Sequence, residues 1–151
     1  MSRAEVRVQL KRLAGSEDLP LPQYQTADSA AVDLRAAVIE PVALHPGDIK
    51  LIPTGLAIAL PPGYEAQVRP RSGLAVKHGL SLPNTPATID ADYRGEIQIP
   101  LINHGKATVT IERGMRIAQM LVTPVPRIVW DVVDELPASI RGTGGFGHTG
   151  N

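Results

Sequence analysis

Proline and glycine recur along the whole chain and divide it into short runs. Each contributes 14 of the 151 residues, and both interrupt helices, proline because it lacks a backbone N–H and glycine because ordering its backbone costs entropy. Turn-forming combinations of these residues stand between the apolar runs, at 45–48 (HPGD), 61–63 (PPG), 103–106 (NHGK) and 112–114 (ERG). A chain interrupted this often favours many short strands over long helices.

The runs between these turns have the patterns of β-strands. Val6, Val8 and Leu10 alternate with polar residues, which gives an extended segment one apolar and one polar face. The same alternation returns twice, and two further runs are more continuously apolar, as buried strands are. The predicted strands are 6–10, 56–60, 64–68, 97–101 and 120–125. We therefore expect an all-β fold, either a sandwich, a jelly roll or a barrel.

Only one short stretch predicts a helix. It runs from Ser72, a candidate N-cap, to Gly79, a candidate C-terminal stop. The length of 151 residues suits one domain. Because the apolar pattern fades at Pro137, we expect a β domain over 1–136 and a flexible tail over 137–151. Trp130, the one tryptophan, is expected in the core.

Charge and composition exclude several classes of partner. Fifteen Lys and Arg balance fifteen Asp and Glu, so no overall field would attract nucleic acid or an acidic membrane. The chain has no cysteine, which excludes disulfides and thiolate metal sites and suits a reducing cytoplasm. No segment approaches the roughly 20 apolar residues of a membrane span, and the first 13 residues lack the continuous apolar run of a signal peptide. We expect a cytoplasmic protein without a nucleic-acid or membrane partner.

The glycine-rich tail is the first of three segments with the residues for chemistry. Residues 141–150 read RGTGGFGHTG, in which five glycines free the backbone to wrap closely around a ligand and Arg141 supplies a fixed cation. Phe146, the one phenylalanine, would suit stacking on a base. The composition fits a disordered tail without function equally well, so both interpretations stay open.

The second segment, PRSG at 70–73, stands where the predicted helix begins. Unpaired N–H groups at a helix N-terminus, a hydroxyl and a guanidinium would together bind phosphate. The alternative is an ordinary helix cap beside a solvated arginine, and on this segment alone it is the simpler interpretation.

Three carboxylates crowd the third segment, IDADYRGE at 89–96. A carboxylate with an unperturbed pKa is ionised at neutral pH, and it can accept a proton from water or help to hold a cation. A charged loop with a turn at Gly95 is the alternative. The four histidines, at 45, 78, 104 and 148, are too scattered to form a metal motif and are expected in loops or at the surface.

Taken together and in order, these segments closely resemble the five motifs of the trimeric dUTPase family, which span almost the whole chain. The first motif is matched by 30–34 (AAVDL), the second by 70–75 (PRSGLA) and the third by 84–96 (NTPATIDADYRGE). Residues 116–119 (RIAQ) match the fourth, and the tail matches the fifth. Ala31 and Ala87 depart from the pattern, because the family usually has glycine at both positions. If the glycine of the family has positive φ, the backbone at the alanine must take a different local geometry.

The resemblance implies a jelly-roll subunit, a homotrimer and active sites shared between subunits. It also implies hydrolysis of dUTP to dUMP and pyrophosphate, by attack of water on the α-phosphorus with Mg²⁺ as cofactor. This reaction lowers dUTP and supplies dUMP for thymidylate synthesis. Mg²⁺ would be held mostly by the substrate phosphates and by water, which explains why the sequence shows no dense ligand cluster. The rivals are a dCTP deaminase of the same fold, a non-catalytic nucleotide-binding trimer and a plain structural β domain.

The resemblance assigns the site residues as well. Asp90 would be the base that deprotonates the attacking water, and Asp33 would help to position the metal through its water shell. Tyr93 would pack against the deoxyribose and exclude a 2′-hydroxyl, while Asn84 would read the polar edge of uracil. The other substrate-binding residues would be Arg71, Ser72, Gly73 and Gln119 at the phosphates, Arg141 at the γ-phosphate, Phe146 over the uracil, and Thr88, Ile89 and Gly147.

Overall fold

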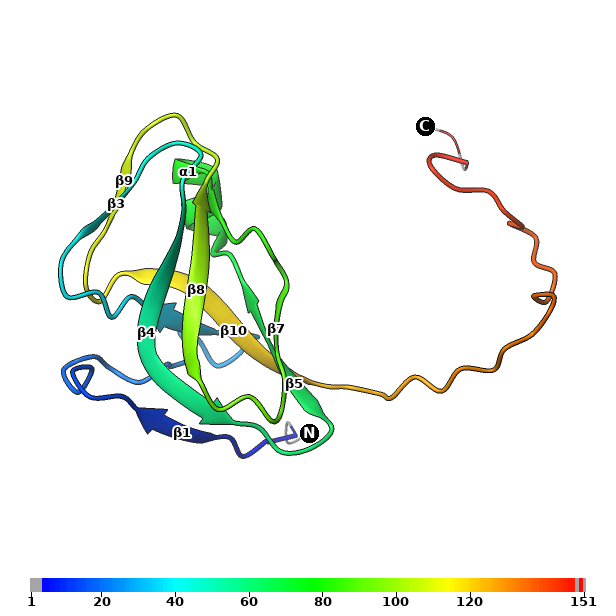
Figure 1. Ribbon diagram of the computed structural model, residues 1–151, viewed down its shortest axis with the longest axis horizontal. Helices are drawn as coiled ribbons and strands as arrows, with labels where there is room; N and C mark the ends of the chain where they lie inside the picture. The colour runs from blue at the N-terminus through cyan, green and yellow to red at the C-terminus, as the bar shows by residue number, and fades with distance from the viewer. Residues whose placement is uncertain (1–3, 149, 151) are drawn as a thin grey trace.

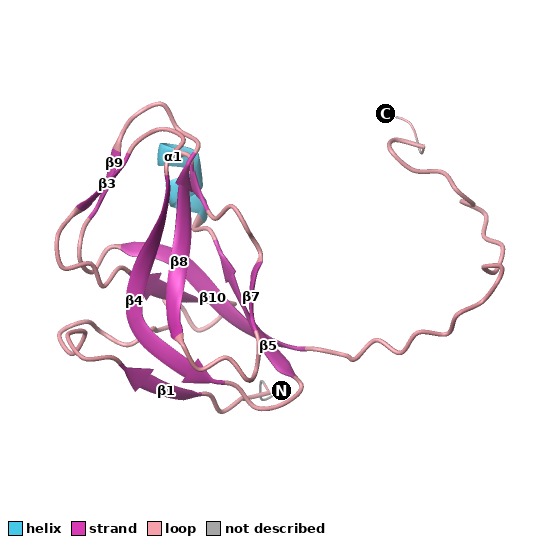
Figure 2. Ribbon diagram, in the orientation of Figure 1, coloured by secondary structure: helices cyan, strands magenta, loops and turns pink. Residues whose placement is uncertain are grey.

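The computed structural model describes residues 4–148 and 150, and this part of the chain contains ten strands and one short helix. The elements in chain order are β1 (Gln9–Arg12), β2 (Val32–Arg35), β3 (Val42–Leu44), β4 (Ile49–Ala59), β5 (Tyr64–Arg69), α1 (Ser72–His78), β6 (Leu80–Ser81), β7 (Ala87–Ile89), β8 (Glu96–Asn103), β9 (Val109–Ile111) and β10 (Arg116–Pro124). Strands and the loops that join them form the body, with α1 at one end of it (Figures 1 and 2).

The strands form two four-stranded sheets and one small one. The larger sheets have the orders β1-β4-β8-β6 and β2-β10-β5-β7, and β3 pairs with β9. Every pair of neighbouring strands is antiparallel. The predicted all-β class is confirmed, and the arrangement is compatible with a jelly roll. Within the described residues no helix has the length and apolar character needed to cross a membrane.

Apolar side chains from both larger sheets form one buried cluster. On β8 the residues alternate between buried and more exposed positions, so Ile97, Ile99 and Leu101 all belong to the cluster. Ile117 and Ala118 join it from β10 in the other sheet. Burying one such aliphatic side chain stabilises a fold by about 1.5–3 kcal/mol, so this cluster holds the two sheets together.

Four of the five predicted strands coincide with β4, β5, β8 and β10, although 56–60 and 120–125 each end one residue beyond the observed strand. The first begins at Gln9 instead of Val6. β1 is an edge strand that pairs only with β4, and all four of its residues are exposed, Leu10 among them. The strand is therefore shifted toward the C-terminal side of the predicted range, and Leu10 is exposed at the edge of the sheet, whereas Val8 packs against the core.

The helix ends as predicted but begins one residue earlier than expected, at Ser72 itself. Gly79 takes the left-handed conformation at φ 68° and stops the helix. The prediction of Ser72 as N-cap is wrong, because Ser72 is already helical. Arg71 has extended backbone and its carbonyl accepts the first helical hydrogen bond, from Ala75 N at 3.0 Å. No side chain caps this end of the helix.

Arg113 fixes the long connection between β1 and β2. Its guanidinium makes two hydrogen bonds to Asp18, from Nη2 at 2.5 Å and from Nε at 3.0 Å, and it also donates to the carbonyls of Gly15, Ala37 and Val38. The hydrogen bond from Arg113 lowers the pKa of Asp18 below its usual value. These contacts hold the connection that leads into β2, the strand that carries the expected site residue Asp33.

The chain leaves the body after β10. Val125 N donates to Gly63 O at 2.8 Å, and from there the backbone runs outward as an extended arm (Figure 1). Trp130 lies on this arm and is 81% exposed. The prediction that it belongs to the core is wrong, because the segment beyond Val125 has no sheet of its own chain to pack against.

Candidate active site

Four residues expected at the phosphates lie together in one cavity with Asp33, the residue expected near the metal. The four are Arg71, Ser72 and Gly73 where the chain enters α1, and Gln119 of β10, while Asp33 comes from β2. The sheet order explains this grouping, because β10 lies between β2 and β5 and places Gln119 opposite Asp33 on one side and opposite Arg69 on the other. The cavity has a volume of about 410 Å³. We call it the cationic cavity.

Asp33 joins two arginines beside the cationic cavity. Its Oδ1 accepts a hydrogen bond from Arg71 Nε at 3.1 Å, and its Oδ2 accepts one from Arg116 Nη1 at 3.1 Å. The Asp33 side chain is only 13% exposed, and such charge-assisted hydrogen bonds fix its orientation firmly. One carboxylate between two guanidinium groups leaves this cluster with a net positive charge, which suits a phosphate.

Arg116 was missed among the site residues predicted from the sequence. It lies within the fourth motif, and that was the only signal available before the structure placed it against Asp33. Gln119 in the same motif donates from Nε2 to Pro70 O at 2.9 Å. The fourth motif therefore holds both the first motif and the start of α1 in place.

A second cavity, of about 330 Å³, lies between β7 and the start of β8. The residues of the β domain expected around the base, the sugar and the attacking water line it: Asn84, Thr88, Ile89, Asp90 and Tyr93. Apolar residues of both larger sheets form much of its wall, among them Leu51, Val68 and Ile97. An apolar wall with a few polar groups at its edge is typical of sites for small organic ligands. We call it the apolar cavity.

A tight loop carries Asp90 and Tyr93 at the apolar cavity. Tyr93 N donates to Asp90 O at 3.1 Å, and Arg94 Nη1 donates to the carbonyls of Ala91 and Tyr93 at 2.6 and 3.0 Å. The Asp90 carboxylate makes no hydrogen bond or ion pair with any residue that the structure describes. An exposed, unpaired carboxylate at the end of β7 can take up a proton from water.

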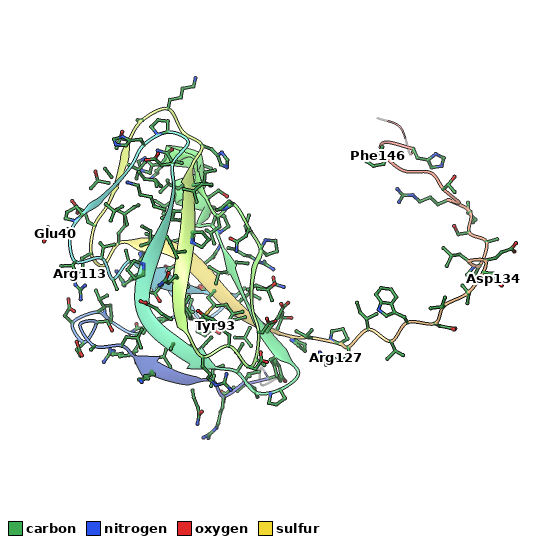
Figure 3. All side chains as sticks on the ribbon, in the orientation of Figure 1. Glu40, Tyr93, Arg113, Arg127, Asp134 and Phe146 are labelled. Atoms are coloured by element: carbon green, nitrogen blue, oxygen red, sulfur yellow. The ribbon has the colours of Figure 1, made fainter. Side chains whose placement is uncertain are left out.

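The predicted tail residues lie far from both cavities. Figure 3 shows Tyr93 on the body and Phe146 near the end of the extended arm, and Phe146 is fully exposed. Arg141 contacts only its own segment, through a hydrogen bond from Nε to Gly144 O at 2.7 Å. Gly147 takes a left-handed conformation beside Phe146. Within one chain, the predicted residues of the cationic cavity lie together and those of the apolar cavity lie together, but the tail residues lie at neither cavity.

No residue belongs to the linings of both cavities. The residues with phosphate chemistry and those with base, sugar and water chemistry are therefore separated on one chain. Over residues 4–148 and 150, no three His, Cys, Asp or Glu side chains come together as a metal site. All four histidines are exposed, as predicted.

The two alanines that replace glycine do not disturb the site. Ala31 lines the cationic cavity and Ala87 lines the apolar cavity. Phe146 is the one described residue other than glycine with positive φ, so neither alanine is in a conformation that requires glycine. Each adds a methyl group to its cavity wall without backbone strain.

The family profile and one relative place these features in a known context. The dUTPase family profile matches residues 17–150. The chain is 60% identical over 147 residues to the deoxyuridine 5′-triphosphate nucleotidohydrolase of Maricaulis maris (strain MCS10), which covers 96% of this chain and 97% of that protein. The profile match extends over all five predicted motifs.

Solved structures show the same fold. The dUTPase of Staphylococcus bacteriophage 80alpha with dUPNHPP superposes with a TM-score of 0.85 at 27% identity, over 96% of this chain and 99% of that one. A mutant dUTPase from phage phi11 of S. aureus, described for its coordination of a structural Mg(II) ion, superposes with a TM-score of 0.76 at 25% identity, over 87% and 99%. The five motifs, the two cavities and these similarities together establish that the chain belongs to the dUTPase family.

Proposed function

We propose that this chain is a dUTP diphosphatase, which hydrolyses dUTP to dUMP and pyrophosphate. The observation that carries the proposal is the presence on one chain of a cationic cavity and an apolar cavity with an unpaired carboxylate. The cationic cavity offers positive charge to the triphosphate, and the apolar cavity offers an apolar wall to the nucleoside and a carboxylate to the attacking water. The 60% identity to a deoxyuridine 5′-triphosphate nucleotidohydrolase supports the choice of substrate. The reaction would lower dUTP and supply dUMP for thymidylate synthesis.

Asp90 is the proposed base. Its carboxylate accepts a proton from water as the water oxygen bonds to the α-phosphorus, and the bond from that phosphorus to the bridging oxygen of pyrophosphate breaks. The lack of any partner for this carboxylate in the described chain supports the role, because both oxygens remain available. Pyrophosphate leaves, and dUMP keeps the new oxygen.

The other residues bind, orient and exclude. Arg71, Ser72, Gly73 and Gln119 hold the phosphates, and the positive charge around Asp33 stabilises negative charge that develops on the leaving group. In the apolar cavity, Tyr93 packs against the deoxyribose and leaves no room for a 2′-hydroxyl. Asn84 reads the polar edge of uracil, with Thr88 and Ile89 beside it.

The donor set of this chain fits Mg²⁺ that is carried by the substrate. Mg²⁺ keeps several waters and takes few protein ligands in nucleotide sites, and the described residues offer no cluster of three or more ligands. Each Asp33 oxygen accepts one arginine hydrogen bond and retains acceptor capacity for a metal-bound water. When bound, Mg²⁺ would neutralise phosphate charge and act as Lewis acid for the leaving group. The structural Mg(II) ion described for the phage phi11 relative supports the coarser point that this fold can hold Mg²⁺.

A homotrimer with shared active sites would unite the separated groups. On one chain the cavities have no lining residue in common and the tail reaches neither. We propose that the tail, over 137–151, closes a site of another subunit, with Arg141 at the γ-phosphate and Phe146 with Gly147 over the uracil, while residues 1–136 form the β domain and the base of the arm. The lack of cysteine suits the cytoplasm as the compartment.

A substrate screen tests the proposed function. Pyrophosphate release is measured with dUTP, dTTP, dCTP and UTP at equal concentrations and with Mg²⁺, and only dUTP is expected to turn over efficiently. Release of ammonia from dCTP would identify a deaminase instead. Nucleotide binding without any pyrophosphate release would identify a non-catalytic binding protein.

A further inference from the structure

Tyr93 is held in place by one hydrogen bond and not by burial. Its side chain is 46% exposed, and its hydroxyl donates to the main-chain carbonyl of Glu96 at 2.8 Å. The ring lies over Gly95, where an added Cβ would collide with the phenol oxygen and ring carbons. The position of the ring therefore depends on where Glu96 is fixed.

The Glu96 side chain fixes that carbonyl to the neighbouring strand. Its Oε1 accepts a hydrogen bond from Gly55 N at 2.8 Å. Gly55 lies in a bulge of β4, because the β4–β8 register shifts between Pro53 and Ala57, and Glu96 is paired with Ala57 at the end of that shift. The N–H of Gly55 is buried, and as part of a bulge it lacks a carbonyl acceptor on the neighbouring strand. The carboxylate of Glu96 is its acceptor instead.

The bulge itself is anchored from its other side. Ser16 Oγ donates to Gly55 O at 2.9 Å, and Leu13 N donates to the same carbonyl at 2.8 Å. Gly55 has φ 68°, and an added Cβ there would collide with Ser16. Thr54 Oγ1 also donates to Ile97 O at 2.6 Å, next to Glu96. A rigid bulge therefore supports Glu96, and Glu96 supports Tyr93.

We propose that Glu96 is a positioning residue that sets the discrimination between deoxyribonucleotide and ribonucleotide through Tyr93. The inference rests on the proposed function and adds a residue to it. Glu96 lines the apolar cavity beside Tyr93, so a shift of its carbonyl changes the wall where the sugar would lie. Without the carboxylate, Gly55 N loses its acceptor, the start of β8 relaxes and the ring loses its fixed hydrogen-bond partner. The space for a 2′-hydroxyl then opens.

The test compares two substitutions at Glu96 by the ratio of kcat/KM for dUTP to kcat/KM for UTP. Glu96→Ala should lower the ratio by about three- to tenfold, the effect of losing one hydrogen bond. Glu96→Gln keeps a carbonyl that can accept from Gly55 N, so it should restore the ratio to within about twofold of the parent. Glu65→Ala is the matched control, because among the residues that the structure describes the Glu65 side chain binds only Gln67, and it lines neither cavity.

A double-mutant cycle separates positioning from general damage. Tyr93→Phe alone should lower the ratio, because the hydroxyl bond is lost, and Glu96→Ala should add little in that background. An unchanged ratio in active Glu96→Ala protein, or an equal loss in the Tyr93→Phe background, would overturn the inference. If Glu96→Ala does not fold, Glu96→Met replaces it, since it removes the acceptor but keeps the length of the side chain, and the same outcomes apply. A parent without dUTP turnover would instead refute the proposed function.

Discussion

Complementation between two inactive variants tests whether the tail acts on another subunit. One variant carries Asp90→Asn with an intact tail, and the other retains Asp90 but ends at Ile140. In the proposed homotrimer, each variant on its own should be inactive, the first without its base and the second without Arg141, Phe146 and the rest of the glycine-rich segment. Unfolding the two together and refolding them would then give mixed trimers.

The length of the arm permits a tail to reach another subunit, and random mixing of the two variants then gives the expected recovery of activity. Residues 126–141 of the arm can span up to about 50 Å when extended, at about 3.3 Å per residue, whereas a body of this size has a radius of gyration of about 14 Å. The arm therefore reaches well beyond its own subunit. If each site takes Asp90 from one chain and the tail from another, an equal mixture leaves about a quarter of the sites with both parts intact.

The assay is pyrophosphate release from dUTP by refolded mixtures whose composition has been verified by mass spectrometry of the intact trimers. About a quarter of the activity of the parent protein, refolded in the same way, is expected. Each variant refolded alone is the control for residual turnover. If the tail closed the Asp90 site of its own chain, no mixture would contain a complete site. Verified mixed trimers that stay as inactive as their parents would therefore refute the trans arrangement.

Three further predictions concern single residues. Asp90→Asn should lower single-turnover hydrolysis by about 10²–10⁴-fold, because an amide cannot accept the proton of water, yet keep nucleotide affinity within about tenfold; turnover near that of the parent would remove Asp90 from its role. Tyr93→Ala should raise kcat/KM for UTP relative to dUTP, and an unchanged ratio would place sugar discrimination elsewhere. Asn103→Leu should lower the free energy of unfolding by about 2–4 kcal/mol, because the fully buried side chain binds Leu44 O, Ala107 O and Gly105 N; urea unfolding measures this loss, and a midpoint equal to that of the parent would contradict it.

The sequence predicted those parts of the fold that repeat a pattern over several residues. β8 alternates over eight positions, so its buried face is visible in the residue order alone. β3, β6, β7 and β9 have only two or three residues each, too few for any period to appear. Their pairing comes from tertiary contacts with longer strands, which no local pattern contains.

The candidate site divides in the same way. The motifs predicted which residues share a cavity, since Arg71, Ser72 and Gly73 are consecutive and Asp90 and Tyr93 share one loop. They did not predict Arg116 as a partner of Asp33, because that contact joins strands far apart in the sequence. Ser72 illustrates a local failure, since a good capping residue became the first helical residue once the Arg71 carbonyl accepted the first hydrogen bond.

The exposed Trp130 gives the arm a built-in optical reporter. It is the one tryptophan of the chain, and it lies outside the body, so indole fluorescence reports on the arm and is nearly blind to the β domain. An indole in water emits at longer wavelength than one packed against apolar groups. Emission of an isolated subunit should therefore resemble that of free tryptophan. A shift to shorter wavelength as the protein concentration is raised would show that the arm packs against the surface of a neighbouring subunit.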